Sequence, residues 1–338
     1  MTMPTVYIVI LNWNGWQDTI ECIESLLKLN YENYRIVVCD NYSRDGSIEK
    51  IQKWSISEQI EGEYIEYNSN SELWLSEKVN VQISSNRGIT LIQTGDNRGF
   101  AGGNNIGIRY SLFDPSCQYV WILNNDTVVE PGSLSALVER SQADSNIGIC
   151  GSKLLYYDEP LKVQAWGGAK YNKWIGATRT LGFCESSDKK VDTQDIEESM
   201  DYVVGASMLV SRSFLTEIGL MNEEYFLYAE EIDWIARSKH RYRLGYADKS
   251  IVYHKEGKSI GLNTKEGLSS YIGEYYGKRS ILIYTKKYEK LLLPFIYGGM
   301  IIAILNRFRR FQFDRALMIF MLLIDHNYPI GRDNNLSQ

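Results

Sequence analysis

The feature that most constrains the fold is a series of short apolar runs, each followed by small polar residues. Runs that do not alternate and are rich in β-branched residues predict strands that are buried on both faces. Helical patterns separate these runs, and alternating strands and helices predict βαβ units and a parallel sheet. Because such crossovers are right-handed, the carboxyl ends of the strands share one edge. The predicted strands are Val6–Leu11, Arg35–Cys39, Ile89–Thr94 and Tyr119–Leu123.

The segments between and after these strands give weaker signals. Residues 55–88 have little periodicity and many polar groups, and we interpret them as an insertion with a hairpin. Residues 156–200 are predicted to be rich in loops, and the chain from about Glu274 onward is predicted to be helical. Further helices are predicted over Ile48–Trp54, Gly102–Ser111 and Glu230–His240, and a further strand over Ser250–Tyr253.

Polar clusters follow three of the predicted strands and should meet at the shared sheet edge, where α/β proteins bind ligands. The clusters are Asn12–Asn14, Asp40–Asp45 and Asn124–Asp126. The first cluster reads NWNG, and the chain lacks both the GxGxxG fingerprint and the P-loop motif. A dinucleotide site or a P-loop is therefore disfavoured.

The cluster Asn124–Asp126 has the composition of a cation site. It offers one carboxylate and two amide oxygens, and Mg²⁺ takes such ligands together with substrate phosphates. The alternative is that Asp126 caps the helix that follows. His254 ends a predicted strand. A lone histidine is usually structural, but a cation site elsewhere in the chain favours the role of metal ligand.

Two further segments fit a nucleotide. Asp40 stands at a strand end, where its carboxylate could accept a hydrogen bond from the N3–H of a pyrimidine, and the alternative is a simple turn. The segment NRGFAGGNN (97–105) places three glycines just before a predicted helix. Backbone can then approach a ligand closely, and a helix N-terminus favours anions. The alternative is a packing turn, although the asparagines would be costly to bury without partners.

The segment YAEEIDW (228–234) is the candidate for general-base catalysis. On a helix, Glu230 and Asp233 share a face and Glu231 is offset from it. A carboxylate in a cleft can remove a proton from a hydroxyl group. The usual alternative is a solvated helix face, but the aromatic and aliphatic residues around this run indicate partial burial.

Seven motifs in this order resemble the family 2 glycosyltransferases, and most closely the rhamnosyltransferase-like members that build bacterial surface polysaccharides such as O-antigen. The motifs are VILNWNG, VVCDNYSRDGS, NRGFAGGNN, VWILNNDTVVEPG, DYVVGASMLVSR, FLYAEEIDW and VYHKEG, and they cover roughly residues 5–260. The resemblance implies the GT-A fold, an α/β fold with a Rossmann-like, mostly parallel central sheet flanked by helices, here with a helical C-terminal extension.

The resemblance also implies a division of the chain and a role for each matching residue. Residues 1–265 would form the GT-A domain, with a nucleotide-binding half (1–130) and an acceptor and catalytic half (131–265), followed by a basic-aromatic region (266–338). Asp126 and His254, with Asn124, would hold Mg²⁺ or Mn²⁺ on the donor diphosphate. The residues expected to bind the nucleotide sugar are Asn12, Asn14, Asp40, Asn41, Ser43, Asn97, Gly99, Phe100, Asn104, Asn125, Trp166 and Gly167.

Glu231 matches the position of the catalytic base in the family, with Glu230 and Asp233 beside it. Two positions depart from the family pattern. Asn124 stands where the family has an acid, which puts the dependence on a metal in question. Glu231 stands where the family has an aspartate, one methylene shorter, so Asp233 remains an alternative base.

Charge and cysteine content limit the partners and the compartment. The net charge of −6 argues against general nucleic-acid binding. Five widely spaced cysteines without a CxxC pair indicate reduced thiols in a cytoplasmic protein. No basic leader or small-residue cleavage site precedes the first strand, so no signal peptide is expected.

The C-terminal region is strongly basic, with nine basic residues against two acids between Lys278 and Arg315. It contains Leu291–Asn306, sixteen residues without a charge, which is short of the roughly 17–25 that a spanning helix needs. Basic and aromatic flanks on such a helix predict an interfacial segment on the inner, anionic face of the cell membrane. The alternatives are a core helix and a homodimer contact.

The sequence therefore predicts a membrane-peripheral, inverting glycosyltransferase that moves a sugar from a UDP-sugar or dTDP-sugar donor to a lipid-linked saccharide acceptor. Two alternatives stay open at this point. One is a sugar-phosphate nucleotidyltransferase, which would need a glycine-rich, basic loop where this chain has NWNG. The other is a non-catalytic protein that binds nucleotide sugars.

Overall fold

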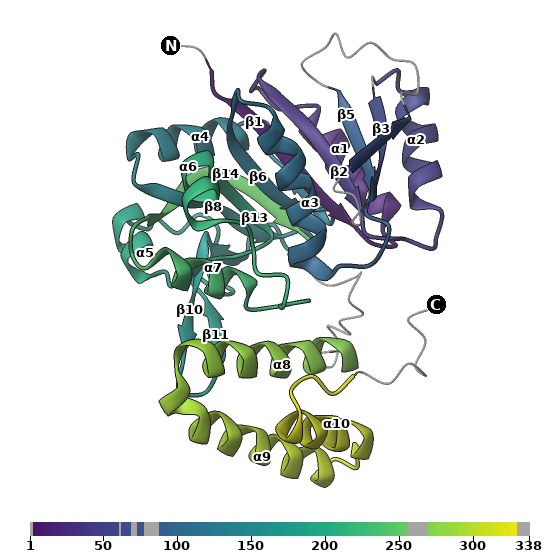
Figure 1. Ribbon diagram of the computed structural model, residues 1–338. Helices are drawn as coiled ribbons and strands as arrows, with labels where there is room; N and C mark the ends of the chain where they lie inside the picture. Colours follow the sequence, from purple (N-terminus) through teal and green to yellow (C-terminus); the bar gives the residue numbers. More distant parts are fainter. Residues whose placement is uncertain (1–2, 61, 69–72, 78–87, 256–269, 330–338) are drawn as a thin grey trace.

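The computed structural model describes residues 3–60, 62–68, 73–77, 88–255 and 270–329. Within them, the centre of the molecule is a mixed sheet with helices on both faces, and three C-terminal helices lie below it (Figure 1). The strands lie in the order β4-β3-β5-β2-β1-β6-β13-β8-β14-β7, with β9 paired to β8. The predicted fold class is therefore confirmed.

The N-terminal half supplies the continuous parallel part of the sheet. Each neighbouring pair among β3, β5, β2, β1 and β6 is parallel, so their carboxyl ends lie along one edge as predicted. The helices α1 (Trp16–Leu26), α2 (Ser47–Ser57) and α3 (Gly99–Phe113) connect or flank them. The strands are β1 (Thr5–Asn12), β2 (Tyr34–Asp40), β3 (Gly62–Asn68), β5 (Ile89–Gln93) and β6 (Cys117–Asn124).

The insertion predicted at residues 55–88 is a hairpin that extends the central sheet. β3 pairs antiparallel with β4 (Leu73–Glu77), which confirms the hairpin. β3 also pairs in parallel with β5, so the hairpin forms the edge of the sheet instead of a separate lobe. Residues 78–87 lie outside the described residues.

The second half of the chain is more regular than predicted. β13 (Ser207–Ser211) runs antiparallel between β6 and β8, and β14 (Arg243–His254) runs parallel to β8. The prediction that residues 156–200 are rich in loops holds for more than half of them, but it missed β9, β10, β11 and α5 (Thr193–Ser199), each of which is short. The remaining strands are β7 (Thr127–Val129), β8 (Ile147–Tyr156), β9 (Val163–Trp166), β10 (Gly168–Asn172), β11 (Ala177–Thr180) and β12 (Tyr202–Val203).

Successive side chains of the central strands point to opposite faces of the sheet and pack into two separate hydrophobic cores. In β1, Ile8 and Ile10 belong to the cluster on one face of the sheet, whereas Tyr7 and Val9 belong to the cluster on the other. This arrangement confirms the prediction that the apolar runs are buried on both faces. The remaining helices of this body are α4 (Ser133–Ala143), α5 (Thr193–Ser199), α6 (Arg212–Ile218) and α7 (Glu230–Ser238).

The glycine-rich segment forms the first turns of α3, although the sequence predicted that it precedes the helix. A β-carbon on Gly103 would lie 2.4 Å from Leu11 Cδ1, and one on Gly107 would lie 2.5 Å from Val9 Cγ1. Both glycines therefore let α3 approach β1 more closely than any other residue would allow. Packing, the alternative considered for this segment, accounts for Gly103, whereas Gly107 lies just beyond the segment.

The C-terminal region is helical, as predicted, and comprises α8 (Tyr271–Tyr288), a short 3₁₀ turn (Lys290–Leu292), α9 (Leu293–Arg309) and α10 (Phe313–Ile324). Judged by length and composition, the 20-residue stretch Lys290–Arg309 could cross a membrane. The sequence count fell short because it stopped at the flanking charges, whereas the helix continues through them.

Candidate functional site

The three predicted metal ligands meet where β6 and β14 end. His254 Nε2 lies 3.2 Å from Asp126 Oδ1 and 3.4 Å from Asn124 Nδ2. The pairing of β14 with β7 produces this contact, because it sets His254 opposite Thr127, next to Asp126. The fold thus joins residues that are far apart in the sequence.

The orientation of His254 suits a cation. Its Nδ1 lies 2.9 Å from Gln164 Oε1, an acceptor, so Nδ1 carries a proton and Nε2 is the nitrogen that faces Asp126. Burial acts to raise the pKa of Asp126, but the charge and hydrogen bond of His254 outweigh it and lower that pKa. A lone pair that faces a carboxylate needs a proton or a cation between them, so these residues fit a metal ion.

Protein ligands alone do not complete this metal site. Among the described residues, no group of three His, Cys, Asp or Glu side chains could hold a metal ion. Asn124 would contribute its amide oxygen, and phosphate oxygens of a bound substrate would supply further ligands. Gln164, which orients His254, had no signal in the sequence because nothing local links β9 to β14.

A second polar network closes the ends of β1 and β2. Asp40 accepts hydrogen bonds from Asn12 Nδ2 at 2.6 Å, Ser43 N at 3.0 Å and Gln93 Nε2 at 3.0 Å. Ser43 Oγ in turn accepts from Asn14 N at 2.8 Å. Asp40 has no exposed surface, so it organises the loop in this structure. Its contact with a pyrimidine stays a prediction that requires the loop to open.

Asn125 joins this network to the metal residues. Its Nδ2 donates to Thr19 Oγ1 at 3.1 Å and Gly15 O at 3.3 Å, and Thr19 Oγ1 donates to Asn12 Oδ1 at 2.8 Å. The polar clusters after β1, β2 and β6 therefore form one continuous edge, as the strand order predicted. Their direct contact with a nucleotide sugar stays a prediction.

The start of α3 is held by protein groups. Asn41 Nδ2 donates to Asn97 Oδ1 at 2.9 Å and to Gly99 O at 3.1 Å, and Phe100 N donates to Phe226 O at 2.8 Å. Gly99 N donates to Asn97 Oδ1 at 3.1 Å. The N–H groups of Gly99 and Phe100, the first two residues of the helix, are thus already paired with protein groups. Anion binding at this terminus stays a prediction.

Gly99 is nevertheless required at its position. Its φ is +66°, and an added β-carbon would lie 2.2 Å from Phe226 O. The glycine therefore allows the start of α3 to contact the segment that leads into α7. Asn104, further along the helix, donates to Phe100 O at 3.0 Å, and its buried Oδ1 has no hydrogen-bond partner among the described residues.

Glu231 contacts the segment just before β13, the strand that pairs antiparallel with β6. Its Oε1 accepts a hydrogen bond from Gly205 N at 3.2 Å, and the adjacent Ala206 accepts at its carbonyl oxygen from Asn124 N at 3.0 Å. A β-carbon at position 205 would lie 2.5 Å from Glu231 Oε1 and 3.4 Å from Phe100 Cζ, so a larger residue there would displace the Glu231 carboxylate. No pattern in the sequence distinguishes Gly205 from the other glycines.

The two glutamates at the start of α7 have raised pKa values. Burial raises the pKa of Glu231 to about 7, against the opposing hydrogen bond from Gly205. Burial and the neighbouring Glu231 raise the pKa of Glu230 well above its usual value. Tyr228 and Ala229, which precede the helix, both adopt φ of 68°. Such left-handed, non-glycine residues store strain and cluster at functional sites.

Asp233, the alternative base, is fully committed to other contacts. It has no exposed surface and accepts from Arg237 Nε, Lys287 Nζ and Tyr288 OH, each at 2.8 Å. Burial acts to raise its pKa, but these three donors outweigh burial and lower it. A carboxylate neutralised by two cations is a weak base. These contacts fix α7 to α8 through Asp233, and the role of Glu231 as the base stays a prediction.

The substitution Asp233→Asn is expected to lower the free energy of unfolding by about 3 kcal/mol at pH 7, because it leaves two cations without their anion. The pKa of Asp233 is lowered in the folded state, so its contribution is present above pH ~4 and is lost as pH falls below that value. Chemical denaturation at pH 7 and pH 3 measures the difference. Asp158→Asn, at an exposed position, is the control and should change stability little at either pH.

Trp166 and Gly167 contribute to packing between β9, β8 and β14. Trp166 belongs to an apolar cluster with Leu155 and Tyr246, and Lys189 Nζ lies 5.3 Å from the centre of its ring. Gly167 has a φ of +69°, and an added β-carbon would lie 2.7 Å from Tyr246 Cδ2. Their contact with a nucleotide sugar stays a prediction.

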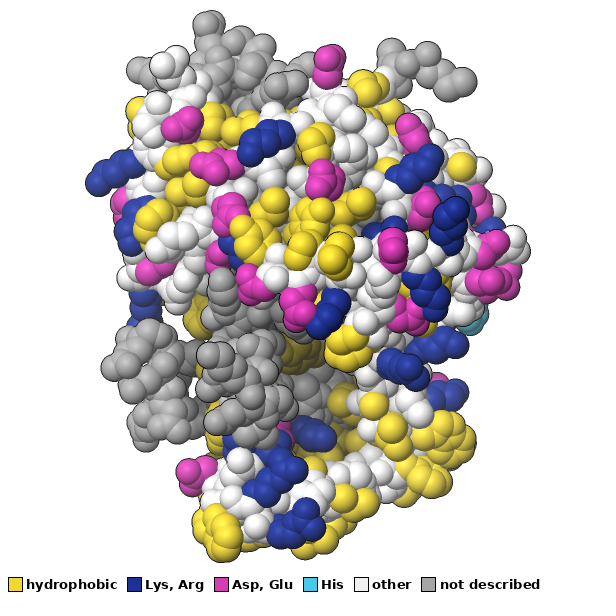
Figure 2. Space-filling model, turned by 180° about the vertical axis from the view of Figure 1, so that it is seen from behind, with side chains coloured by type: hydrophobic (Ala, Val, Ile, Leu, Met, Phe, Trp, Pro, Cys, Tyr) yellow, Lys and Arg dark blue, Asp and Glu magenta, His cyan; other side chains and the backbone are white. Residues whose placement is uncertain are grey.

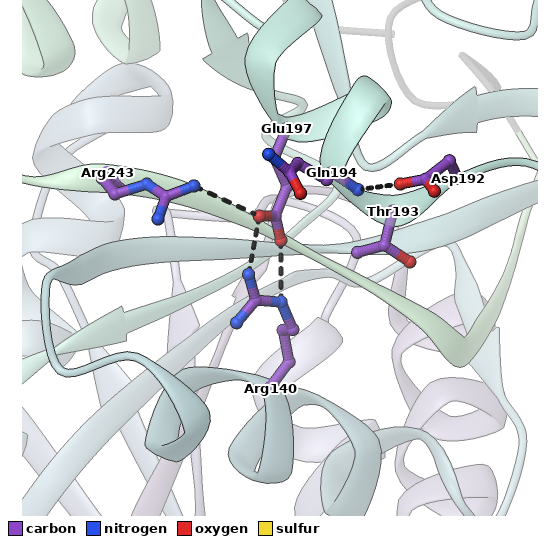
Figure 3. A pocket seen from close by; sticks show the side chains of 6 residues that line it. All are labelled: Arg140, Asp192, Thr193, Gln194, Glu197 and Arg243. Carbon is purple, nitrogen blue, oxygen red and sulfur yellow. Dashed lines mark hydrogen bonds and ion pairs between the residues drawn. The ribbon is translucent and has the colours of Figure 1, made fainter.

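A pocket of about 440 Å³ lies elsewhere, at the end of β14 opposite to His254 (Figure 3). At its centre, Glu197 accepts from Arg140 Nε at 2.8 Å and Arg140 Nη2 at 2.6 Å, and Arg243 Nη2 lies 3.9 Å from it. Glu197 also accepts from Tyr246 N at 2.8 Å. This ion-pair network anchors α5 to the sheet, and we assign the pocket a structural role.

Comparison with known proteins points to one family. Residues 7–73 and 68–182 match the family described as "Glycosyl transferase family 2". The "Low-salt glycan biosynthesis hexosyltransferase Agl10" of Haloferax volcanii is 28% identical over 204 residues. These residues span 60% of this chain and 61% of that relative's length.

Two solved structures share the fold. "GalNAc-T7 with UDP, GalNAc and Mn2+" has a TM-score of 0.57 at 14% identity and covers 83% of this chain and 48% of its own. "Mannosyltransferase PcManGT from Pyrobaculum calidifontis in complex with GDP-Man and Mn2+" has a TM-score of 0.55 at 12% identity. It covers 97% of this chain and 88% of its own. At such low identity these likenesses show the fold alone, which is of the predicted GT-A type.

Proposed function

Because the chain belongs to glycosyl transferase family 2, we propose that it is an inverting glycosyltransferase with a UDP-sugar or dTDP-sugar donor. The acceptor in this proposal is a lipid-linked saccharide in the assembly of a cell-surface polysaccharide, with rhamnose among the candidate sugars. The Haloferax relative is named as a hexosyltransferase of glycan biosynthesis, which supports sugar transfer. One observation carries the proposal. Asn124 N, beside Asp126 and His254, donates a hydrogen bond to Ala206 O, and the preceding residue, Gly205, donates one from its N–H to Glu231. These two hydrogen bonds link the candidate metal ligands to the candidate base.

The chemistry assigns a separate task to each of these groups. Asp126, His254 and Asn124 would hold Mg²⁺ or Mn²⁺, which when bound neutralises charge on the leaving diphosphate. Glu231 takes the proton from the acceptor hydroxyl group, whose oxygen forms a bond to C1 of the sugar. The bond from C1 to the diphosphate oxygen breaks, and its electron pair leaves with the nucleoside diphosphate.

The position and pKa of Glu231 support its role as the base. Its carboxylate is partly buried and accepts a hydrogen bond from Gly205 N, which restricts its orientation. A base with a pKa near 7 is ionised often enough to accept a proton and is basic enough to remove one. With the base at one side of C1 and the diphosphate at the other, attack inverts the configuration at C1.

A thermal-shift panel tests the donor assignment. UDP or dTDP is expected to stabilise the protein, more strongly with Mn²⁺, by roughly 2.7 kcal/mol at a hundredfold excess over the dissociation constant. GDP, CDP and NAD should have little effect. The nucleotide that gives the largest shift identifies which nucleotide sugars to use as donors in turnover assays. These assays measure the released nucleoside diphosphate. A preference for GDP or NAD, or a pyrimidine shift that Mn²⁺ does not change, would contradict this assignment.

A further inference from the structure

The C-terminal helices expose a large apolar surface, which we call the apolar face. On α9, Phe295, Ile302 and Leu305 are 56%, 61% and 63% exposed. Their spacing of seven and three residues places them on one side of the helix. Ile296 and Met300 on the other side are buried against the neighbouring helices. One side of α9 is therefore buried and the other is exposed, although both sides are apolar.

The same surface continues onto α10. Phe313, Leu317, Phe320 and Ile324 follow each other at intervals of four, three and four residues, which is one helical stripe, and all four are exposed. The rings of Phe308 and Phe313 lie 5.7 Å apart and join this stripe to α9. Contiguous exposed patches of this kind are rare on soluble monomers and mark a surface that binds a partner.

A hairpin of the main body extends the apolar face at its other end. Trp174, in the turn between β10 and β11, is 52% exposed, and its ring lies 5.2 Å from that of Phe295. The neighbouring Ile175 is exposed as well. The apolar face thus runs from this hairpin along α9 to α10, and Figure 2 shows part of it along the lower margin of the molecule.

Charge identifies the kind of partner. Lys290, Arg309 and Arg310 are exposed at the two ends of α9, and within the described chain no ion pair involves them. By contrast, Arg307 and Arg315 are held by Glu274. Residues 278–315 carry a charge of +7 in a chain of −6, so the remainder carries −13. An anionic surface would attract the C-terminal helices and repel the rest of the molecule.

We propose that the apolar face inserts into the interface of an anionic lipid bilayer, with Lys290, Arg309 and Arg310 at the level of the phosphates. A surface position buries the stripes of α9 and α10 together. A membrane span does not, because the 12 residues of α10 reach only about 18 Å, against a hydrocarbon thickness of about 30 Å. This inference goes beyond the proposed function and does not depend on it.

Vesicle binding by the full chain tests the inference. The protein is sedimented with phosphatidylcholine vesicles and with vesicles in which roughly one third of the lipid is phosphatidylglycerol. We expect binding to the anionic vesicles and at least a tenfold loss for the double variant Ile302→Glu, Leu305→Glu. Ile56→Glu, at a residue of α2 that is 67% exposed, is the matched control and should bind like the wild type.

The charge contribution is tested separately. The double variant Arg309→Gln, Arg310→Gln should lose roughly fivefold per arginine toward anionic vesicles and little toward neutral ones. Failure of the wild type to bind, or equal binding by the Ile302, Leu305 variant, would overturn the inference. A concentration-dependent dimer that the same variant dissociates would assign the apolar face to a second copy of the chain instead. No sugar donor is present, so the outcome is independent of the proposed transfer.

Discussion

Replacing Glu231 by Gln is expected to lower the turnover of sugar transfer by about a thousandfold, within the range for loss of a general base. The amide keeps the shape of the side chain and can still accept from Gly205 N, but it cannot take a proton from the acceptor. Turnover of the donor identified in the thermal-shift panel, measured with acceptor present, gives the effect. Glu139→Gln, at an exposed position of α4, is the matched control and should retain full activity.

The pH profile separates this role from a structural one. Activity of the wild type should rise with pH through about 7, because only the ionised Glu231 accepts a proton. The residual activity of Glu231→Gln should lack that rise. A raised pKa means that ionisation of Glu231 costs stability in the folded state at higher pH. The neutral variant should therefore unfold at the same or a higher temperature than the wild type at pH 8.

Other outcomes would contradict this assignment of the base. If Glu231→Gln kept its activity and a folded Asp233→Asn lost it, the base would be Asp233. If the wild type and Glu231→Gln showed the same negligible turnover with all donors, yet both bound the nucleotide, the protein would be a non-catalytic binding protein. Nucleotide binding by Glu231→Gln should match that of the wild type, because Glu231 does not contact the diphosphate in our proposal.

Asp126→Asn is expected to abolish the part of nucleotide binding that depends on Mn²⁺ and to lower turnover by about a hundredfold or more. The physical reason is the loss of the one carboxylate among the proposed metal ligands, since a bound cation supplies several kcal/mol of charge stabilisation. Thermal shifts with nucleotide, with and without Mn²⁺, give the binding effect, and turnover gives the catalytic one. Asp158→Asn is again the control.

The reverse change strengthens this test. Asn124→Asp adds a second carboxylate beside Asp126 and His254, so Mn²⁺ should bind more tightly. Without metal the same variant should be less stable than the wild type, because two carboxylates then repel each other. Equal stabilisation of wild type, Asp126→Asn and Asn124→Asp by Mn²⁺ would place the metal elsewhere or remove it from the proposal.

Local patterns in the sequence predicted the parallel half of the sheet and the polar edge. The runs around Ile8 and Ile122 are buried on both faces, and the clusters that contain Asn12 and Asp126 follow strands that lie side by side. Such features depend on neighbours within one strand and its turn. The strands within residues 156–200 were missed because they are short and because β10 is paired in part with β12, which lies much further along the chain.

The sequence by itself determined the fold class, the sheet edge that holds the site, and the candidates Asp126, His254 and Glu231. The carboxylates of α7 differ in surroundings that only the tertiary structure shows, and this difference is the basis for proposing Glu231 as the base. Lys287 from α8 neutralises Asp233, whereas Glu231 is partly buried and accepts a hydrogen bond from Gly205 N. The structure alone also showed that Gln164 orients His254. Burial and charge pairing set the chemistry of a side chain, and both depend on residues that only folding brings together.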